Sequence, residues 1–271
     1  MNDRLVIENL RVHYGRGPEQ VEAVAPMSLT VPSGQKLGIV GESGSGKSTL
    51  LKAILGLVRP PGRVEADGIW LDGRNLLHLK PKEFQALCGS ELAMIFQDPV
   101  SSLNPSFTIR YQFRRAFRLH QPELPRRDYE RRMTQVLAQV GIEARGALDR
   151  YPFEFSQGQL QRITIALACA SPRLKVLLAD EPTASLDVTT QAQVLDLLDT
   201  LHAQLGFTLI LVTHNLPVVA ELCDRVLVMR RGHVVEDADV VSLFDNPTHE
   251  YTRHLLASMV TPRPVEPGRR S

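Results

Sequence analysis

A glycine-rich turn that ends in lysine and serine is the strongest chemical signal in this sequence. Nine consecutive residues match the pattern G-x-x-x-x-G-K-[ST]: Gly41, Glu42, Ser43, Gly44, Ser45, Gly46, Lys47, Ser48 and Thr49. Because glycine lacks a Cβ, the backbone can bend sharply at the three glycines and come close to an anion. The pattern predicts a phosphate-binding loop, or P-loop.

The sequence on either side supports a P-loop. An apolar run at residues 37–40 indicates a buried strand before the turn, and a helix is expected to begin near Lys47, where helix amides and the helix dipole favour negative charge. In such a loop the lysine reaches the β- and γ-phosphates, and the Ser48 hydroxyl binds Mg²⁺. The alternative, a chance glycine-rich turn, does not explain the strand and the helix. We therefore expect the chain to bind a nucleoside triphosphate with Mg²⁺.

Two acidic residues follow another apolar run, at residues 176–179. Charges that come directly after a buried strand lie at the carboxyl edge of a sheet, where open α/β sheets bind ligands. We expect Asp180 to hold Mg²⁺, directly or through water, and Glu181 to act as the general base for the water that attacks the γ-phosphate. A polar strand end without a chemical role is the alternative, and the P-loop upstream argues against it.

Two more polar side chains follow apolar runs in the same way. His214 comes after residues 208–212, and this placement favours contact with the γ-phosphate, although a lone histidine is more often structural. Gln97 comes after residues 92–96, and we expect its amide to reach the metal ion or the attacking water. A single glutamine would not by itself indicate a catalytic site.

Residues 155–159 read Phe-Ser-Gln-Gly-Gln and precede an apolar helical pattern. Ser156 and Gln159 have the S-x-x-Q spacing of a capping box, which predicts that a helix begins at this point. A well-capped helix with no further role is one interpretation. A second anion-binding site is the other, because an exposed Ser-x-Gly at a helix N-terminus presents free amides.

The composition is that of an ordinary globular protein. The chain has 271 residues, 43% of them hydrophobic and 23% charged, and its formal net charge of +1 provides no overall field to recruit nucleic acid. The spacing of Cys88, Cys169 and Cys223 does not match a metal site, and Cys169 and Cys223 are expected in the core. No disulfide is expected, which suggests a reducing compartment. We expect no signal peptide and no membrane span, because no stretch approaches the roughly 20 apolar residues that cross a bilayer.

Local charge is less even than the net charge. Eight arginines lie between Arg110 and Arg132, against three carboxylates. One interpretation is a solvated helical face, and the other is a surface that meets acidic loops or lipid headgroups.

The apolar patterns predict alternating strands and helices, which favours a mainly parallel sheet with helices on both faces. Strands are expected at residues 5–14, 21–31, 36–40, 64–71, 92–96, 175–179, 208–212 and 226–229. Between and after them we expect a polar loop at 97–105, two helices within 109–141 and short closing helices within 239–258. The expected division is a core of residues 1–105 and 171–260, a helical insertion at 106–170 and a disordered tail at 261–271.

These motifs occur in the order found in the ATP-binding subunits of ABC transporters, and the chain resembles this family over roughly residues 4–258. The motifs are the P-loop, Gln97, residues 155–159, Asp180–Glu181, Ser185-Leu186-Asp187 and His214. The resemblance implies an α/β fold. It would have a P-loop NTPase (RecA-like) core with a mainly parallel sheet, an N-terminal antiparallel β subdomain and an α-helical subdomain insertion.

The resemblance also implies a head-to-tail dimer with two ATP molecules between the subunits. Each ATP would contact the P-loop of one chain and the signature of the other, namely Ser156, Gln157, Gly158 and Gln159. Tyr14 would stack on adenine, and Asp187 would cross the dimer interface. The helical insertion would carry the signature and the surface that faces the membrane subunits.

Further stretches resemble the branch that imports dipeptides, oligopeptides and nickel. They are residues 96–99, 102–105, 151–154, 180–183 and 247–252. This implies an ATPase that powers solute import at the cytoplasmic face of a bacterial inner membrane. The implied partners are a second ATP-binding subunit (a paralogue or a copy), two transmembrane permeases and, indirectly, an extracytoplasmic solute-binding protein. Peptides, nickel and metal–chelator complexes all remain open as the solute.

Two functions without transport are the alternatives. An ABC-type ATPase that acts on nucleic acid or ribosomes would be expected to carry long coiled-coil insertions or tandem ATPase domains, and the sequence has neither. An enzyme-assembly subunit, as in relatives linked to phosphonate breakdown, is disfavoured by residues 102–105.

The signature departs from the usual Leu-Ser-Gly-Gly-Gln at two positions, with Phe155 in place of leucine and Gln157 in place of the first glycine. If that glycine position requires a positive φ or a close approach to phosphate, glutamine is unfavourable there. We expect the ATP site that faces this signature to turn over more slowly, which favours a paralogue as partner. The C-terminal cysteine cluster of some relatives is absent, so no iron–sulfur cluster is expected.

Overall fold

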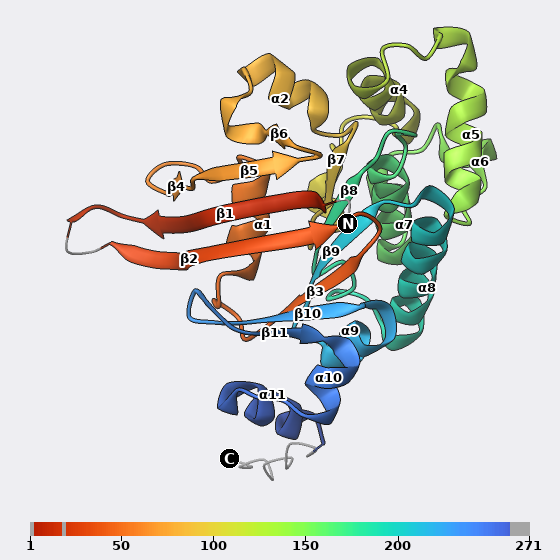
Figure 1. Cartoon of the computed structure of the whole chain (residues 1–271). Coiled ribbons are helices and arrows are strands. Elements are labelled where there is room, and N and C mark those ends of the chain that lie inside the picture. The colour runs from red at the N-terminus through yellow and green to blue at the C-terminus, as the bar shows by residue number, and fades with distance from the viewer. Residues whose placement is uncertain (1–2, 18–19, 261–271) are drawn as a thin grey trace, which may run out of the picture.

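The computed structural model describes residues 3–17 and 20–260 of the chain. Its centre is a six-stranded sheet with the strand order β11-β10-β3-β9-β8-β7 (Figure 1). The strands are β3 (Lys36–Val40), β7 (Leu92–Ile95), β8 (Val176–Asp180), β9 (Thr208–Val212), β10 (Arg225–Arg230) and β11 (His233–Asp239). Strands β3, β7, β8, β9 and β10 all run parallel to one another, and β11 runs antiparallel to β10. The prediction of a mainly parallel sheet is therefore confirmed.

Helices cover both faces of this sheet, so side chains along each strand alternate between two cores. In β8, Val176 and Leu178 pack on the side of helix α1 (Lys47–Ile54), whereas Leu177 and Ala179 pack on the opposite side. The helices on that opposite side are α7 (Gln157–Ala168), α8 (Val188–Leu205) and α9 (Leu216–Leu222). Because both faces are covered, every residue of β8 is buried, and the strand reads as a continuous apolar run.

A second, antiparallel sheet lies over α1, as expected for an N-terminal β subdomain. It contains β1 (Asp3–Tyr14), β2 (Val21–Pro32), β4 (Arg63–Glu65), β5 (Gly68–Leu71) and β6 (Arg74–Asn75). The prediction of one strand at residues 64–71 is wrong. β4 pairs with residues 11–13 of β1 and β5 pairs with residues 5–8, so the chain must break between them to reach two different places on the same partner.

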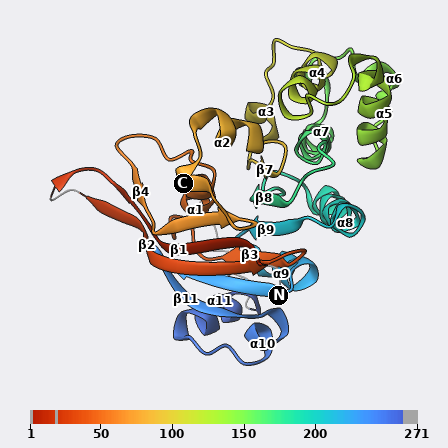
Figure 2. The ribbon, with the colours of Figure 1, turned by 45° about the horizontal axis from the view of Figure 1, so that its top comes forward.

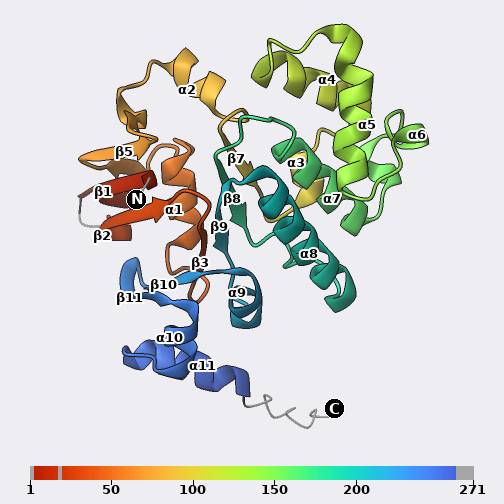
Figure 3. The same cartoon turned by 45° about the vertical axis from the view of Figure 1, so that its right-hand side comes forward.

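The helical insertion includes α4 (Ile109–His120), α5 (Tyr129–Gln139) and α6 (Ala144–Ala147). Figures 2 and 3 show these helices grouped at one end of the molecule, away from the antiparallel sheet. Their core is nevertheless continuous with that of the sheet, because Phe113 and Phe117 of α4 belong to the same buried cluster as Leu177 of β8. The insertion is therefore packed onto the central sheet by a shared apolar core.

Some short elements are absent from the sequence prediction. Helix α2 (Pro81–Leu87) and strand β11 were not expected, and the polar loop at 97–105 contains helix α3 (Pro99–Ser102). Asp98 caps α3 by accepting hydrogen bonds from the amides of Val100 and Ser101. The closing helices are α10 (Val240–Asp245) and α11 (Glu250–Val260), and the tail at 261–271 lies outside the described residues.

Cys169 and Cys223 are buried, as expected of small core residues, and burial raises the pKa of each thiol to about 12.

Part of the arginine-rich stretch forms ion pairs within the insertion: Arg110 pairs with Glu130 and with Asp149 (2.6 Å), and Arg114 pairs with Glu130. In the described part of the chain, no helix is both long and apolar enough to span a bilayer.

Candidate nucleotide-binding site

The parallel strands bring the predicted site residues to one edge of the central sheet. Ile39 of β3 pairs with Val212 of β9, and Val212 also pairs with Asp180 of β8. The segments that follow these strands are the P-loop, Thr213–His214 and Glu181, so all of them begin at the same edge. The expectation that the polar strand ends meet is confirmed.

The P-loop backbone is held against two other strands. Gly41 and Gly46 have φ values of 151° and 103°, in the region that favours glycine. A Cβ at Gly41 would lie 2.1 Å from the Met229 carbonyl oxygen, and one at Gly46 would lie 2.3 Å from the Ala23 carbonyl oxygen. Met229 belongs to β10 and Ala23 to β2, so both sheets enclose the loop and leave no room for a side chain at these positions.

Lys47 begins α1 and is buried within the loop. Its ammonium group donates hydrogen bonds to the carbonyl oxygens of Gly41 (2.7 Å) and Glu42 (2.8 Å). Burial lowers the pKa of Lys47, although the carboxylates of Glu181, Asp180 and Glu42 oppose that shift. No side chain among the described residues caps the first amides of α1, so these amides and the lysine together form a positively polarised site suited to phosphate.

Ser48 and Asp180 place two side-chain oxygens beside the loop. The Ser48 hydroxyl donates a hydrogen bond to Asp180 Oδ1 at 2.7 Å. Burial raises the pKa of Asp180, while the hydrogen bond from Ser48 and the charges of Lys52 and Lys47 act in the opposite direction. Hydroxyl and carboxylate oxygens are the donors that Mg²⁺ prefers, so these two residues fit the metal role predicted from the sequence.

Glu181 and His214 are brought together by the ends of β8 and β9. Glu181 Oε2 lies 2.9 Å from His214 Nδ1. The backbone of Glu181 has φ of 46°, which is uncommon for a residue other than glycine and marks a strained backbone at the end of β8. The Glu181 side chain is mostly shielded and that of His214 is 63% exposed, so the pair lies where a bound group and a water molecule have access.

The stretch 155–159 forms a second candidate anion site at the start of α7. Ser156 caps the helix by accepting a hydrogen bond from the Gln159 amide (3.3 Å), and the Gln159 side chain accepts one from the Ser156 amide (3.0 Å). The predicted capping box is confirmed. These residues line a cavity of about 350 Å³ whose lining includes no P-loop residue. The two candidate anion sites of one chain are therefore separate.

Asp187 lies in the same cavity as the signature. It caps α8, accepting hydrogen bonds from the amide (3.0 Å) and hydroxyl (2.7 Å) of Thr190. A Cβ on Gly158 would lie 2.7 Å from Thr190 Cγ2, so the N-termini of α7 and α8 are in close contact. The sequence did not reveal this capping role of Asp187.

The backbone argument against Gln157 is wrong. Gln157 is the first residue of α7 and does not have a positive φ, so the helix accepts glutamine without the expected strain. Its side chain is exposed and lines the signature cavity. If Gln157 slows the ATP site that faces the signature, the reason must be the volume of its side chain.

Three other residues, Gln97, Tyr14 and Tyr251, lie in or near the segments that the sequence singled out. Gln97 follows β7 at the same sheet edge, and its exposed side chain makes no hydrogen bond with the rest of the described chain. Tyr14 ends β1 and packs beside Gly62, where a Cβ would lie 2.6 Å from Tyr14 Cε1. Tyr251 of α11 contacts the P-loop at Glu42, and sequence reasoning missed this although it singled out residues 247–252.

A mainly parallel sheet with such a loop between its strand β3 and helix α1 defines the class of P-loop NTPases. A family model described as "ABC transporter" matches residues 24–184 of the chain. The dipeptide transport ATP-binding protein DppD of Escherichia coli (strain K12) is 43% identical over 256 residues, covering 94% of this chain and 78% of that protein. The oligopeptide transport ATP-binding protein OppF of the same organism is 40% identical over 269 residues, covering 96% and 78%.

Solved structures agree with the sequence relatives. The ATP-binding cassette MJ0796, in a dimeric post-hydrolysis state bound to ADP and Pi, superposes with a TM-score of 0.75 at 27% identity, covering 87% of this chain and 98% of that one. CbiO1 from Clostridium perfringens, part of the ABC transporter complex cbiONQ, superposes with a TM-score of 0.74 at 26% identity, covering 91% and 92%. The chain belongs to the ABC transporter family and is one of its ATP-binding, ATP-hydrolysing subunits.

Gly46→Ala and Gly44→Ala separate steric contact from backbone strain in the P-loop. Both positions have positive φ, but a Cβ at Gly44 would meet no described atom within 4 Å, whereas one at Gly46 meets the Ala23 carbonyl. We expect Gly44→Ala to lower the free energy of unfolding by about 1–2 kcal/mol and Gly46→Ala by about 3 kcal/mol or more. Urea unfolding without nucleotide measures both, and equal losses would contradict the contact with Ala23.

Proposed function

We propose that this chain is the motor subunit of an ABC importer, in which ATP binding closes a dimer of ATP-binding subunits and hydrolysis reopens it. One observation carries this proposal: Lys47, the Ser48–Asp180 pair and the Glu181–His214 pair lie along one sheet edge. ATP that binds two states with different affinity shifts their populations, and a transporter uses that shift to move its permease.

Each residue at this edge has a proposed role. The P-loop amides and Lys47 would hold the β- and γ-phosphates, and Ser48, Asp180 and Gln97 would hold Mg²⁺. Bound Mg²⁺ would neutralise the charge on the phosphate oxygens. Glu181 would orient and deprotonate the attacking water, and His214, hydrogen-bonded to Glu181, would contact the γ-phosphate.

A second copy or paralogue would complete the nucleotide site. The signature cavity of one chain is separate from its own P-loop, so it can contact ATP only when another subunit presents one. The dimeric MJ0796 cassette supports a dimer of this kind. In that arrangement Ser156, Gln157, Gly158 and Gln159 would contact the partner's ATP, Asp187 would reach across the interface, and Tyr14 would stack on adenine.

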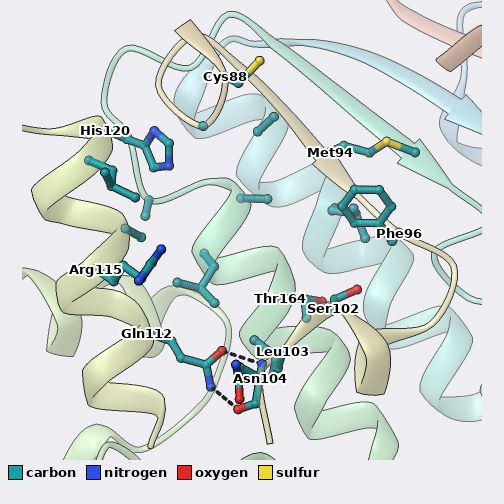
Figure 4. Close-up of a pocket in the computed structure, with 18 of the residues that line it drawn as sticks. Cys88, Met94, Phe96, Ser102, Leu103, Asn104, Gln112, Arg115, His120 and Thr164 are labelled. Carbon is teal, nitrogen blue, oxygen red and sulfur yellow. Dashed lines mark hydrogen bonds between the residues drawn. The ribbon is translucent and has the colours of Figure 1, made fainter. Parts of the chain in front are cut away.

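A groove between the helical insertion and the central sheet would receive a permease. The groove has a volume of about 670 Å³, and Figure 4 shows Arg115 and His120 of α4 on one side and Met94 and Phe96 on the other. Phe96, Phe107, Tyr111 and Leu119 are all exposed along it, although large apolar side chains are usually buried.

The residues of α4 define the chemistry of that partner. Tyr111, Arg115 and Leu119 are spaced four residues apart, so they form one stripe along the helix. Arg115 makes no ion pair with any described residue, unlike Arg110 and Arg114. A short cytoplasmic helix with apolar side chains and a carboxylate opposite Arg115 would complement this stripe.

The solute proposed is a peptide, because the relatives DppD and OppF are named for dipeptide and oligopeptide transport. The proposed assembly contains two ATP-binding subunits, two permeases and an extracytoplasmic solute-binding protein, with this chain at the cytoplasmic face of the membrane. Nickel or a metal chelate is the second candidate for the solute. Purification of the chain from its own membranes tests the assembly, and recovery without polytopic membrane proteins would favour a function outside transport.

Glu181→Gln tests the catalytic assignment. The amide keeps the size of the side chain but cannot accept the proton of the attacking water. We expect ATP hydrolysis to fall by a factor of about 10²–10⁴, while the dissociation constant for Mg-ATP changes little. Steady-state hydrolysis and nucleotide titration measure the two quantities, and near-normal turnover would remove Glu181 from this role.

Gln157→Gly tests whether the altered signature slows the ATP site it faces. Removing the side chain opens the signature cavity, and we expect hydrolysis by the assembled complex to rise about two- to fivefold. The measurement is ATPase activity of the reconstituted dimer at saturating ATP. An unchanged rate would show that the side-chain volume of Gln157 has no effect.

Arg115→Glu tests the groove. This charge reversal would place a carboxylate opposite the proposed carboxylate of the permease helix. We expect recovery of the permease with the tagged chain to fall at least about tenfold. Arg127→Glu is the matched control, because Arg127 is also exposed but does not line the groove. Similar recovery of permease with both variants would contradict docking at this site.

A further inference from the structure

The C-terminal helix α11 contacts the P-loop through one side chain. The Glu42 amide donates a hydrogen bond to the Tyr251 hydroxyl at 3.0 Å, and the Tyr251 side chain is almost completely buried. In Figure 1, α11 lies beneath the turn that joins β3 to α1. A residue more than 200 positions away in the chain therefore touches the second residue of the phosphate-binding motif.

This hydrogen bond fixes the direction of a single peptide group. The carbonyl of Gly41 and the amide of Glu42 belong to the same planar unit, and in a trans peptide they point in opposite directions. Lys47 donates to the carbonyl end, and Tyr251 accepts from the amide end. The unit is thus held from both sides, next to a glycine whose lack of a Cβ permits its φ of 151°.

Tyr251 is itself held in place by neighbouring elements. The guanidinium carbon of Arg230, at the end of β10, lies 4.8 Å from the centre of the Tyr251 ring. The Tyr251 amide donates to His249 Nδ1 at 3.0 Å. The tyrosine is therefore fixed both at its ring and at its backbone.

A buried carboxylate anchors the start of α11. Glu236 of β11 accepts hydrogen bonds from the amide (2.7 Å) and hydroxyl (2.8 Å) of Thr248 and from the amide of His249 (3.1 Å). Burial alone would raise the pKa of Glu236, but the nearby Thr252 hydroxyl, together with the hydrogen bonds from Thr248 and His249, outweighs it, and the pKa lies below its ordinary value. The helix that carries Tyr251 is thus attached to the central sheet just before it begins.

We propose that Tyr251 is a positioning residue for nucleotide binding, which holds the Gly41–Glu42 peptide in the orientation that the phosphate-bound loop requires. Loops that bind phosphate through backbone amides gain affinity when those amides are ordered before the ligand arrives. Tyr251 supplies part of that order from outside the loop. Ordering of α11 and affinity for ATP are therefore linked.

Tyr251→Phe removes the hydroxyl and keeps the ring beneath Arg230. Without the hydroxyl, the Glu42 amide can turn toward other hydrogen-bond acceptors. ATP binding must then restore its orientation, which weakens the affinity. We expect the dissociation constant for a fluorescent ATP analogue with Mg²⁺ and the KM for ATP to rise about five- to tenfold, with kcat changed less than about twofold. The purified full-length chain is titrated for the first quantity, and the ATPase activity of the reconstituted dimer gives the other two.

Two further variants make the result decisive. Tyr129→Phe removes the hydroxyl of another buried tyrosine, in the helical insertion, and should leave the KM unchanged. Glu236→Gln loosens the start of α11 and should raise the KM in the same direction as Tyr251→Phe, but by less. The proposal would be overturned if Tyr251→Phe lowered kcat or the melting temperature and left the KM for ATP unchanged. It would also be overturned if Tyr129→Phe raised the KM as much as Tyr251→Phe does, or if Glu236→Gln left the KM unchanged.

Discussion

The site depends on a close approach between the P-loop backbone and carbonyl groups of two different strands. Met229 of β10 and Ala23 of β2 lie so near Gly41 and Gly46 that a Cβ at either position would overlap a carbonyl oxygen. The Gly232 amide also donates to the Ser45 carbonyl at 3.0 Å, which fastens the loop to the turn after β10. The antiparallel sheet is therefore part of the nucleotide site, because it supplies one wall of the loop.

Sequence reasoning found the parts of the site that depend on strand order. Apolar runs followed at once by charged residues indicate buried parallel strands, and such strands end at a common edge, so the amino-acid sequence alone is enough to group Asp180, Glu181 and His214. Gln97 could be placed for the same reason, because it follows β7, which is parallel to β8.

Other features could not be predicted because they depend on tertiary contacts. The positive φ of Glu181 and the hydrogen bond between Tyr251 and Glu42 leave no local pattern in the sequence. The strand expected at 64–71 was wrong because two short apolar segments pair with separate parts of β1. Helices α2 and α3 are too short for an amphipathic period to be recognised, and the helical conformation of Gln157 follows from the cap at Ser156.

Helix α7 has a mechanical consequence. Its first turn carries the signature, while Thr164, Leu167 and Ala168 near its other end line the groove beside α4. Twelve residues of α-helix form a stiff rod about 18 Å long, and this one is buried in a close-packed interior. A displacement at the signature end of α7 would therefore reach the end beside the groove as a rotation or translation of the whole helix.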